Sequence, residues 1–384
     1  MHSIRPFVLS LSIAMVSVIT QGRGQAAYAE KELDASAFRR RAEMECRQGD
    51  WRRALLDLDQ AILLNPKSGD LYVDRAKVKV SKGDEAGAMS DCSKAIELDP
   101  KAAEAYAVRG KIELDREEYK KALADSNQVL RLNSKSSAGF LIRGCAKSEL
   151  GDGRGALSDF NEALRLNPRD AYALFQRGWL KSSLKDFKGA VADYSASIRI
   201  DPDPIAYINR GYAYMDLKDY PRAIEDFNLA VRLDCGLAKA YYGRALVKWH
   251  SKDFRGSVED NSMAIKLNPE YAEAFVNRGC SQHELGKLEE AFADYKEAIR
   301  IKPKLAKAYT SRANTWLAVK NFKATLEDCK KALALDPKDP ETYYYRGLAR
   351  RALEDAPGAK QDFLEALKLD SDYKQARDAL STIK

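Results

Sequence analysis

Hydrophobic residues recur along the chain with helical spacing, and the stretch Ala272–Pro303 shows the pattern well. Phe275, Gly279 and Cys280 share one helix face, and Gly286 interrupts the run. A second apolar stripe follows at positions i, i+3, i+4 and i+7 and consists of Leu288, Ala291, Phe292, Tyr295, Ala298 and Ile299. Glycine turns the chain between the stripes, and the closing proline ends the second helix. The stretch therefore predicts an antiparallel helix pair.

The same pattern occurs ten times along the chain. An arginine followed by Gly or Ala marks each copy, and successive arginines are 34 residues apart except for one step of 33. An Asp follows each arginine after sixteen residues, and an aromatic precedes it by three, except at Leu174. The predicted copies are residues 35–68, 69–102, 103–136, 137–170, 171–203, 204–237, 238–271, 272–305, 306–339 and 340–373, and a capping helix is expected over about 374–384.

One such helix pair cannot bury its apolar faces alone, so the copies must stack on one another. Helices pack 8–10 Å apart where the side chains between them are small, and Gly144, Ala156 and Ala163 are three such positions in one copy. Phe or Leu at these positions should push neighbouring helices apart. The pattern thus predicts an all-α protein, an α-solenoid of ten antiparallel helix pairs with a C-terminal capping helix.

The recurring arginine and aspartate predict an ion pair within each copy. If the turn lies near the fifteenth position of a copy, the arginine at the seventh position and the aspartate at the twenty-third lie at the same height on the two helices. The alternative is two solvated charges, and an exposed pair would contribute only about 0–1 kcal/mol. The recurrence favours partial burial and a role in register. The pairs named here are Arg143–Asp159, Arg177–Asp193 and Arg278–Asp294.

With its aromatic, small residue, alanines and closing proline within 34 residues, the chain resembles the tetratricopeptide repeat family over residues 35 to about 373. It departs from the family pattern by an arginine before the glycine, and by charged residues such as Lys79 and Glu113 at a position where the family has Tyr. The resemblance implies a right-handed superhelix whose first helices line a concave groove that binds peptides or proteins.

Many cytosolic members of this family hold a carboxylate-terminated peptide through Lys and Asn residues on successive first helices. No consecutive trio of copies carries that set here. The nearest fragments are Asn209, Lys239, Asn277 and Lys307, which lack the remaining residues. The chain is therefore not expected to bind such a terminus.

By analogy with the family, copies five to seven carry an aromatic groove. Exposed apolar surface of this size generally marks an interaction site, and aromatic residues and Met are enriched at interfaces. The alternative is that these side chains pack between adjacent first helices as core. The predicted groove residues are Tyr172, Phe175, Trp179, Ile205, Ile208, Tyr212, Met215, Tyr242, Leu246 and Trp249.

The first 29 residues have the features of a secretory signal peptide. A basic residue at Arg5 precedes an apolar run from Phe7 to Thr20, and Ala27-Tyr28-Ala29 fits a cleavage site. An uncleaved anchor is the alternative, but the run is shorter than the roughly 18 residues that a spanning helix needs. The mature chain is therefore expected to be exported, as a periplasmic or secreted protein, with a bacterial envelope favoured.

Charge and candidate ligands exclude several functions. The net charge of +7 comes from interspersed charges of both signs, whereas a nucleic-acid binder is expected to show a basic stripe. The six cysteines lie in six different copies, which indicates buried free thiols rather than disulfides. Cys280 and His283 could both face one metal ion, but two ligands do not make a site. We expect no metal, no cofactor and no bound nucleic acid.

The small number of residues outside the leader and the repeats argues against an enzyme. Removing the leader and the ten copies leaves residues 30–34 and about 374–384, too little for a catalytic domain. The sequence predicts an exported scaffold or adaptor that binds a peptide or protein in its groove, without stable membrane insertion after cleavage. A carbohydrate- or cell-wall-binding module, or a non-catalytic subunit of an envelope enzyme complex, remain as alternatives. The oligomeric state stays open.

Overall fold

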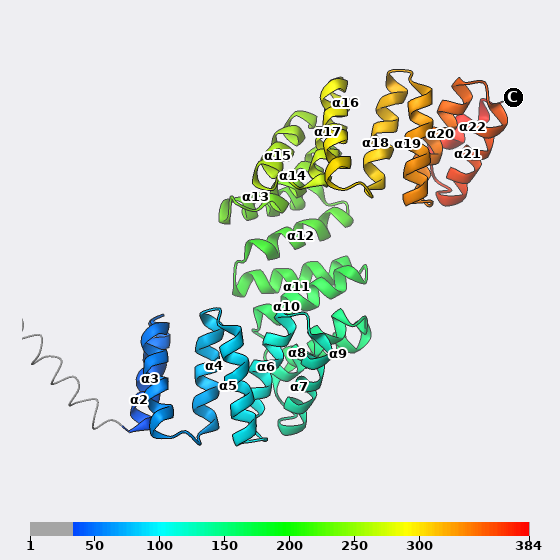
Figure 1. The fold of residues 1–384 in the computed structure, drawn as a ribbon. Helices are drawn as coiled ribbons and strands as arrows, with labels where there is room; N and C mark the ends of the chain where they lie inside the picture. Colours follow the sequence, from blue (N-terminus) through cyan, green and yellow to red (C-terminus); the bar gives the residue numbers. More distant parts are fainter. Residues whose placement is uncertain (1–33, 384) are drawn as a thin grey trace, which may run out of the picture. The chain divides into compact units, whose positions relative to one another are not determined.

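A computed structural model describes residues 34–383, and the predicted signal peptide lies outside these residues. Within them, helices α2 to α22 follow one another without a strand. The chain divides into two compact units, of which unit 1 ends at Leu180 and unit 2 begins at Lys181. The prediction of an all-α fold built from antiparallel helix pairs is confirmed (Figure 1).

Each predicted copy contains one helix pair, and the first helix of each pair begins at the first residue of its copy. In unit 1 the helices are α2 (Ala35–Arg47), α3 (Trp51–Leu64), α4 (Gly69–Ser81), α5 (Glu85–Leu98), α6 (Ala103–Asp115), α7 (Tyr119–Leu132), α8 (Ser137–Glu149) and α9 (Gly153–Leu166). The next helix, α10 (Ala171–Ser183), contains the boundary between the units.

Unit 2 continues the same alternation. Its helices are α11 (Phe187–Ile200), α12 (Pro204–Asp216), α13 (Tyr220–Leu233), α14 (Ala238–His250), α15 (Phe254–Leu267), α16 (Ala272–Glu284), α17 (Leu288–Ile301), α18 (Ala306–Ala318), α19 (Phe322–Leu335), α20 (Pro340–Ala352), α21 (Ala356–Leu369) and α22 (Lys374–Ser381). Helix α22 contacts α21 and α20, and its Ala376 and Ala379 are buried.

The turn inside each pair has a local cause. Gly151 adopts a φ of +86°, a backbone conformation that glycine reaches without strain. Asp152 then caps the second helix, because its carboxylate accepts a hydrogen bond of 2.9 Å from the Gly155 N–H. Asp or Asn caps the second helix in the same way at residues Asp50, Asp84, Asp186, Asp219, Asp253, Asn321 and Asp355.

Small residues let the two helices of a pair come together. A Cβ placed on Gly144 of α8 would lie 2.7 Å from the Phe160 ring of α9, closer than such atoms can approach. Ala156 and Ala163 of the same pair are fully buried. The ring therefore occupies the space that the missing side chain leaves, and the two helix backbones approach closely.

Within each unit the first helices of successive pairs also contact one another. These contacts join α4 with α6 and α6 with α8 in unit 1, and they join α12, α14, α16, α18 and α20 in order in unit 2. The described second helices of successive pairs make at most marginal contact within a unit. Each unit therefore curves around its first helices, which line its inner face.

Candidate functional site

The recurring arginine and aspartate form a buried contact that holds each pair in register. Arg143 donates from Nε and Nη2 to the two carboxylate oxygens of Asp159 at 2.9 and 2.7 Å. Asp159 is only 4% exposed, and the Lys147 ammonium lies 2.8 Å from the same carboxylate. Two parallel hydrogen bonds between planar groups fix geometry as well as charge.

The same two-pronged contact recurs along both units. Arg278 donates to Asp294 at 2.9 and 2.7 Å. Arg177 belongs to unit 1 and Asp193 to unit 2, so their pairing stays a prediction. The other pairs with this contact are Arg41–Asp57, Arg75–Asp91, Arg109–Asp125, Arg210–Asp226, Arg244–Asp260, Arg312–Asp328 and Arg346–Asp362.

Most of these arginines make one or two further contacts that sequence reasoning missed, and Arg244 makes both. The Arg244 guanidinium lies over the Tyr241 ring, 5.4 Å from its centre. Its Nη1 donates to Asn228 on the second helix of the preceding pair at 2.9 Å. The guanidinium therefore connects its own pair to the one before it. The sequence carries a signal for both contacts. An aromatic residue recurs three positions before the arginine, and polar residues such as Asn228 lie sixteen positions before it.

Copies one and three have an acid where other copies have a cation beside the aspartate, and Glu113 of copy three is more deeply buried than Glu45 of copy one. Copies two, four and seven place Lys79, Lys147 and Lys248 within 3 Å of their aspartate, but copy three has Glu113 at this position. Glu113 is 4% exposed, and its Oε2 has no hydrogen-bond partner among the described residues. Burial, aided by the nearby Asp125 carboxylate, raises the pKa of Glu113 to about 7.

The predicted groove residues of unit 1 are partly open to solvent. Tyr172 is 53% exposed and Trp179 is 41% exposed, whereas Phe175 is half-buried. Tyr172 lines a hollow of about 640 Å³ together with residues of α6 and α8, among them Lys111 and Leu141.

In α12, most of the predicted groove residues pack instead. The groove assignment of Ile208 is wrong, because this residue is 3% exposed and belongs to the core around Phe227. Tyr212 packs edge-on against Phe227 with ring centres 5.2 Å apart, and Met215 packs against the same core. The cause is α14, which contacts α12 and covers these positions. Ile205 remains 38% exposed.

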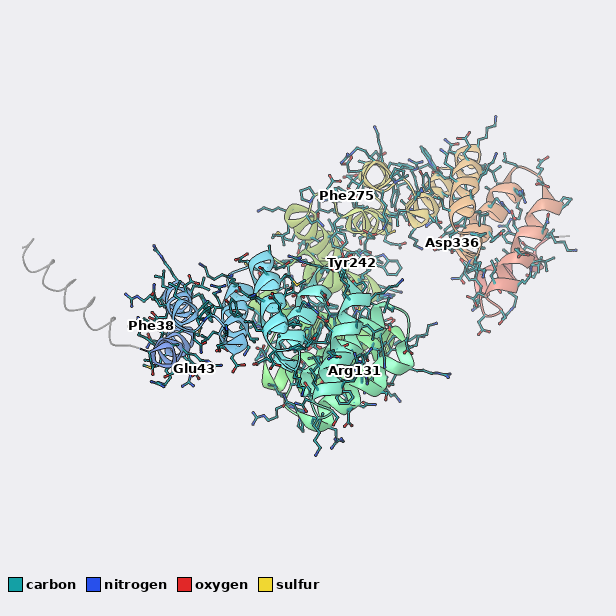
Figure 2. All side chains as sticks on the ribbon, turned by 60° about the horizontal axis from the view of Figure 1, so that its bottom comes forward. Phe38, Glu43, Arg131, Tyr242, Phe275 and Asp336 are labelled. Carbon is teal, nitrogen blue, oxygen red and sulfur yellow. The ribbon has the colours of Figure 1, made fainter. Side chains whose placement is uncertain are left out.

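The predicted residues of α14 face a hollow on the inner face of unit 2. Tyr242, Leu246 and Trp249 line a space of about 400 Å³ among α14, α16, α18 and α20, which we call the α14–α20 hollow. Tyr242 is labelled in Figure 2. Sequence reasoning did not assign the opposite wall, which includes Val276, Cys280, His283, Lys307, Asn314, Glu341 and Tyr345.

Polar groups on the opposite wall are held by one another. The Lys307 ammonium pairs with the Glu341 carboxylate, and the Tyr345 hydroxyl donates to Glu341 Oε1 at 2.7 Å. His283 Nδ1 lies 2.9 Å from the Thr315 hydroxyl. The hollow therefore joins an apolar wall on α14 to a charged, hydrogen-bonding wall on α18 and α20.

The thiol and the imidazole of the hollow are neutral rather than activated. Burial raises the pKa of the Cys280 thiol and lowers that of the His283 imidazole. At neutral pH the thiol thus stays protonated and the imidazole uncharged. Among residues 34–383, no three His, Cys, Asp or Glu side chains gather closely enough to bind a metal ion.

All six cysteines are free thiols. Cys92, Cys145 and Cys329 are buried as expected, Cys46 and Cys280 are only partly buried, and the expectation of burial is wrong for Cys235, which is exposed on the loop after α13. In the part of the chain that the structure describes, no helix has the length and apolar character needed to cross a bilayer.

Comparisons with known proteins agree with this architecture. Tetratricopeptide repeat sequence models match residues 204–234, 281–318, 41–103 and 143–203. No curated protein sequence matches the chain. The Cut9–Hcn1 hetero-tetramer of the APC/C is similar in fold, with a TM-score of 0.58 and 14% identity over 82% of this chain and 76% of that one.

Two further solved structures are similar over all or part of the chain. Yeast Tom70 has a TM-score of 0.48 and 17% identity, covering 91% of this chain and 88% of Tom70. YrrB, a tetratricopeptide repeat protein with an unusual peptide-binding site, has a TM-score of 0.38 and 26% identity over 48% of this chain and 95% of YrrB.

The matched segments together span half of the chain, and the helix pairs follow the same register throughout the described residues. The fold is that of a protein–protein interaction scaffold, a type that is typically non-catalytic. The chain belongs to the tetratricopeptide repeat family.

Proposed function

We propose that this protein is an exported scaffold that binds an extended segment of another protein in the α14–α20 hollow. The observation that carries the proposal is the hollow itself, with Tyr242, Leu246 and Trp249 on one wall and Lys307 and Glu341 on the other. Binding sites typically combine an apolar lining with a few placed polar groups.

A polypeptide suits both walls of this hollow. Its side chains can cover the apolar surface of α14, and its backbone amides can bond to groups such as the Asn314 amide. An extended segment laid along a groove is a common form of peptide recognition. In the α14–α20 hollow a carbohydrate would need flat aromatic faces open to solvent, whereas the Trp249 ring packs edge-on against His250 and Phe254.

The groove can be tested by peptide selection. A random nonapeptide library displayed on phage is selected on the mature chain, and the enriched peptides are titrated by calorimetry. The double variant Tyr242→Ala/Trp249→Ala, and separately the exposed Lys307→Ala, should weaken binding at least about tenfold, a loss that corresponds to about 1.4 kcal/mol.

The matched control is Leu267→Ala/Leu364→Ala, which removes partly exposed apolar side chains from the second helices α15 and α21. The control should bind as the wild type does, and circular dichroism should show equal helix content in all variants. Equal loss in the control, or no loss in either groove variant, would overturn the proposed site. Titration with oligosaccharides tests the carbohydrate alternative, and recovery of an intact enzyme complex from the envelope tests the subunit alternative.

Export rests on the leader sequence. Arg5, the apolar run from Phe7 to Thr20 and the Ala27-Tyr28-Ala29 site are the features that support it. Expression of the full chain in a bacterium should yield periplasmic or secreted protein that begins after Ala29. Cytoplasmic protein with an intact N-terminus would overturn the export proposal and leave the groove proposal untouched.

A further inference from the structure

A second hollow lies at the C-terminal end of unit 2, between α20 and α22. It measures about 450 Å³, and its lining includes three tyrosines and three carboxylates. We call it the tyrosine pocket and define it by Tyr344, Tyr345, Tyr373, Asp339, Glu341 and Asp370. Glu341 and Tyr345 also line the α14–α20 hollow, so the two spaces adjoin along α20.

The Tyr344 ring is partly open because the array ends here. In the two preceding copies the residue two positions before the arginine is covered by the next first helix, and Val276 and Thr310 are 6% and 1% exposed. After α20 the corresponding place is taken by α22, which has eight residues. This shorter helix leaves Tyr344 only half-buried.

Tyr344 packs against both of the other tyrosine rings at tilted or edge-on angles, so a cation can bind only against the ring surfaces that this packing leaves open. The ring centres of Tyr344 and Tyr373 are 5.3 Å apart at an angle of 61°, and those of Tyr344 and Tyr345 are 5.6 Å apart. Aromatic faces carry partial negative charge and attract cations within about 6 Å of the ring centre.

Most of the charged groups around the rings are acids. The Glu341 carboxylate pairs with the Lys307 ammonium and accepts a hydrogen bond from the Tyr345 hydroxyl. The partners of Asp339 and Asp370 are neutral. Asp339 accepts from the Thr310 hydroxyl at 3.2 Å, and Asp370 accepts from the Asp372 N–H at 3.0 Å.

The nearby Arg351 side chain donates to the Thr382 hydroxyl on α22 at 2.7 Å rather than to a pocket acid. The three carboxylates, Lys307 and Arg351 together leave an excess of one negative charge around the pocket. An apolar aromatic space with this rim complements a cation and disfavours an anion.

We propose that the tyrosine pocket binds an arginine or lysine side chain of the polypeptide that occupies the adjoining hollow. This deepens and rests on the proposed function, because it assigns a basic residue to the bound segment. The guanidinium or ammonium group lies against the Tyr344 and Tyr373 rings, and Asp339 and Asp370 balance its charge.

A short probe tests the pocket apart from the longer groove. Acetyl-Gly-Arg-Gly-amide and its citrulline counterpart have nearly the same shape but differ in charge. Each is titrated into the mature chain carrying ring-labelled tyrosine, with Tyr344 and Tyr373 resonances assigned from their Phe variants. The arginine peptide should shift both resonances and bind about tenfold more tightly than the citrulline peptide.

Two variants separate binding from folding. Asp370→Asn keeps an acceptor for the Asp372 N–H but removes a charge, so it should weaken the arginine peptide severalfold and leave the citrulline peptide unchanged. Tyr373→Phe keeps the ring and should bind as the wild type does, whereas Tyr373→Leu should not bind. Equal affinity for both peptides, unmoved tyrosine resonances, or full binding by both Asp370→Asn and Tyr373→Leu would overturn the pocket. The tripeptide is too short to fill the α14–α20 hollow, so its binding tests the tyrosine pocket alone. If Tyr242→Ala/Trp249→Ala does not weaken binding in the groove experiment, the tripeptide result still stands or falls by itself.

Discussion

Glu113 offers the sharpest test of how charge is arranged inside the helix pairs. It occupies the position at which Lys147 contacts Asp159 in the next copy, yet it is an acid buried close to Asp125. In the folded chain it keeps its proton up to a pKa of about 7, whereas its ordinary pKa is 4.5. Folding therefore retains a proton that the unfolded chain has already released.

The sign and size of the effect follow from this difference. The folded state binds more protons between pH 4.5 and 7, so the free energy of unfolding falls as the pH rises through that window. Each tenfold change in proton affinity corresponds to 1.36 kcal/mol, so the loss from this residue amounts to roughly 3 kcal/mol at pH 8. Glu113→Gln keeps the shape of the protonated acid and cannot ionise.

Glu113→Gln should accordingly raise the free energy of unfolding at pH 8 by about 1–3 kcal/mol and change it little at pH 4.5. Glu113→Lys should raise it at pH 8 as well, because lysine can contact Asp125 as Lys147 contacts Asp159. Urea unfolding followed by circular dichroism gives the global value, and amide hydrogen exchange in α6 and α7 gives the local one.

Glu117→Gln is the matched control, because it removes the same charge from an exposed position in the turn between these helices. It should have little effect at either pH. An equal gain for Glu113→Gln at both pH values, or a loss of stability at pH 8, would refute the reasoning.

Three further substitutions test the packing, the ion pairs and the turns. Gly144→Leu should lower the free energy of unfolding by about 1–3 kcal/mol through overlap with the Phe160 ring; a Tm equal to that of the wild type would contradict the packing argument. Arg143→Ala leaves the buried Asp159 with Lys147 alone and should cost about 2–4 kcal/mol in urea unfolding, near the lower part of the range for breaking a buried pair. An Arg143→Ala effect no larger than that of an exposed arginine would mean that the contact is merely a surface pair. Lys218→Gly should raise stability by about 1 kcal/mol, because Lys218 holds a φ of +60° that glycine adopts without strain; a lower Tm would show that the Lys218 side chain stabilises the turn.

The candidate site was only partly predictable, and α12 and α14 show why. Ile208 and Tyr242 occupy the same position of successive copies, yet Ile208 is core and Tyr242 lines the hollow. Position within a copy says which side of a first helix a residue takes. It does not say how closely the next helix covers that side, because this depends on the volumes of the side chains between the two helices.

By itself, the sequence determined the helix pairs, the residue at which each copy begins and the arginine–aspartate contacts within each unit, since a pattern repeated ten times specifies local structure and the nearest packing partner. Gly69 and Ala103 each begin a helix at the predicted first residue of a copy. Tertiary structure alone decided where space remains between helices: the hollow beside Trp249 and the pocket around Tyr344. Empty space is set by how many helices meet and how closely they approach, and no spacing of residues along one chain records that.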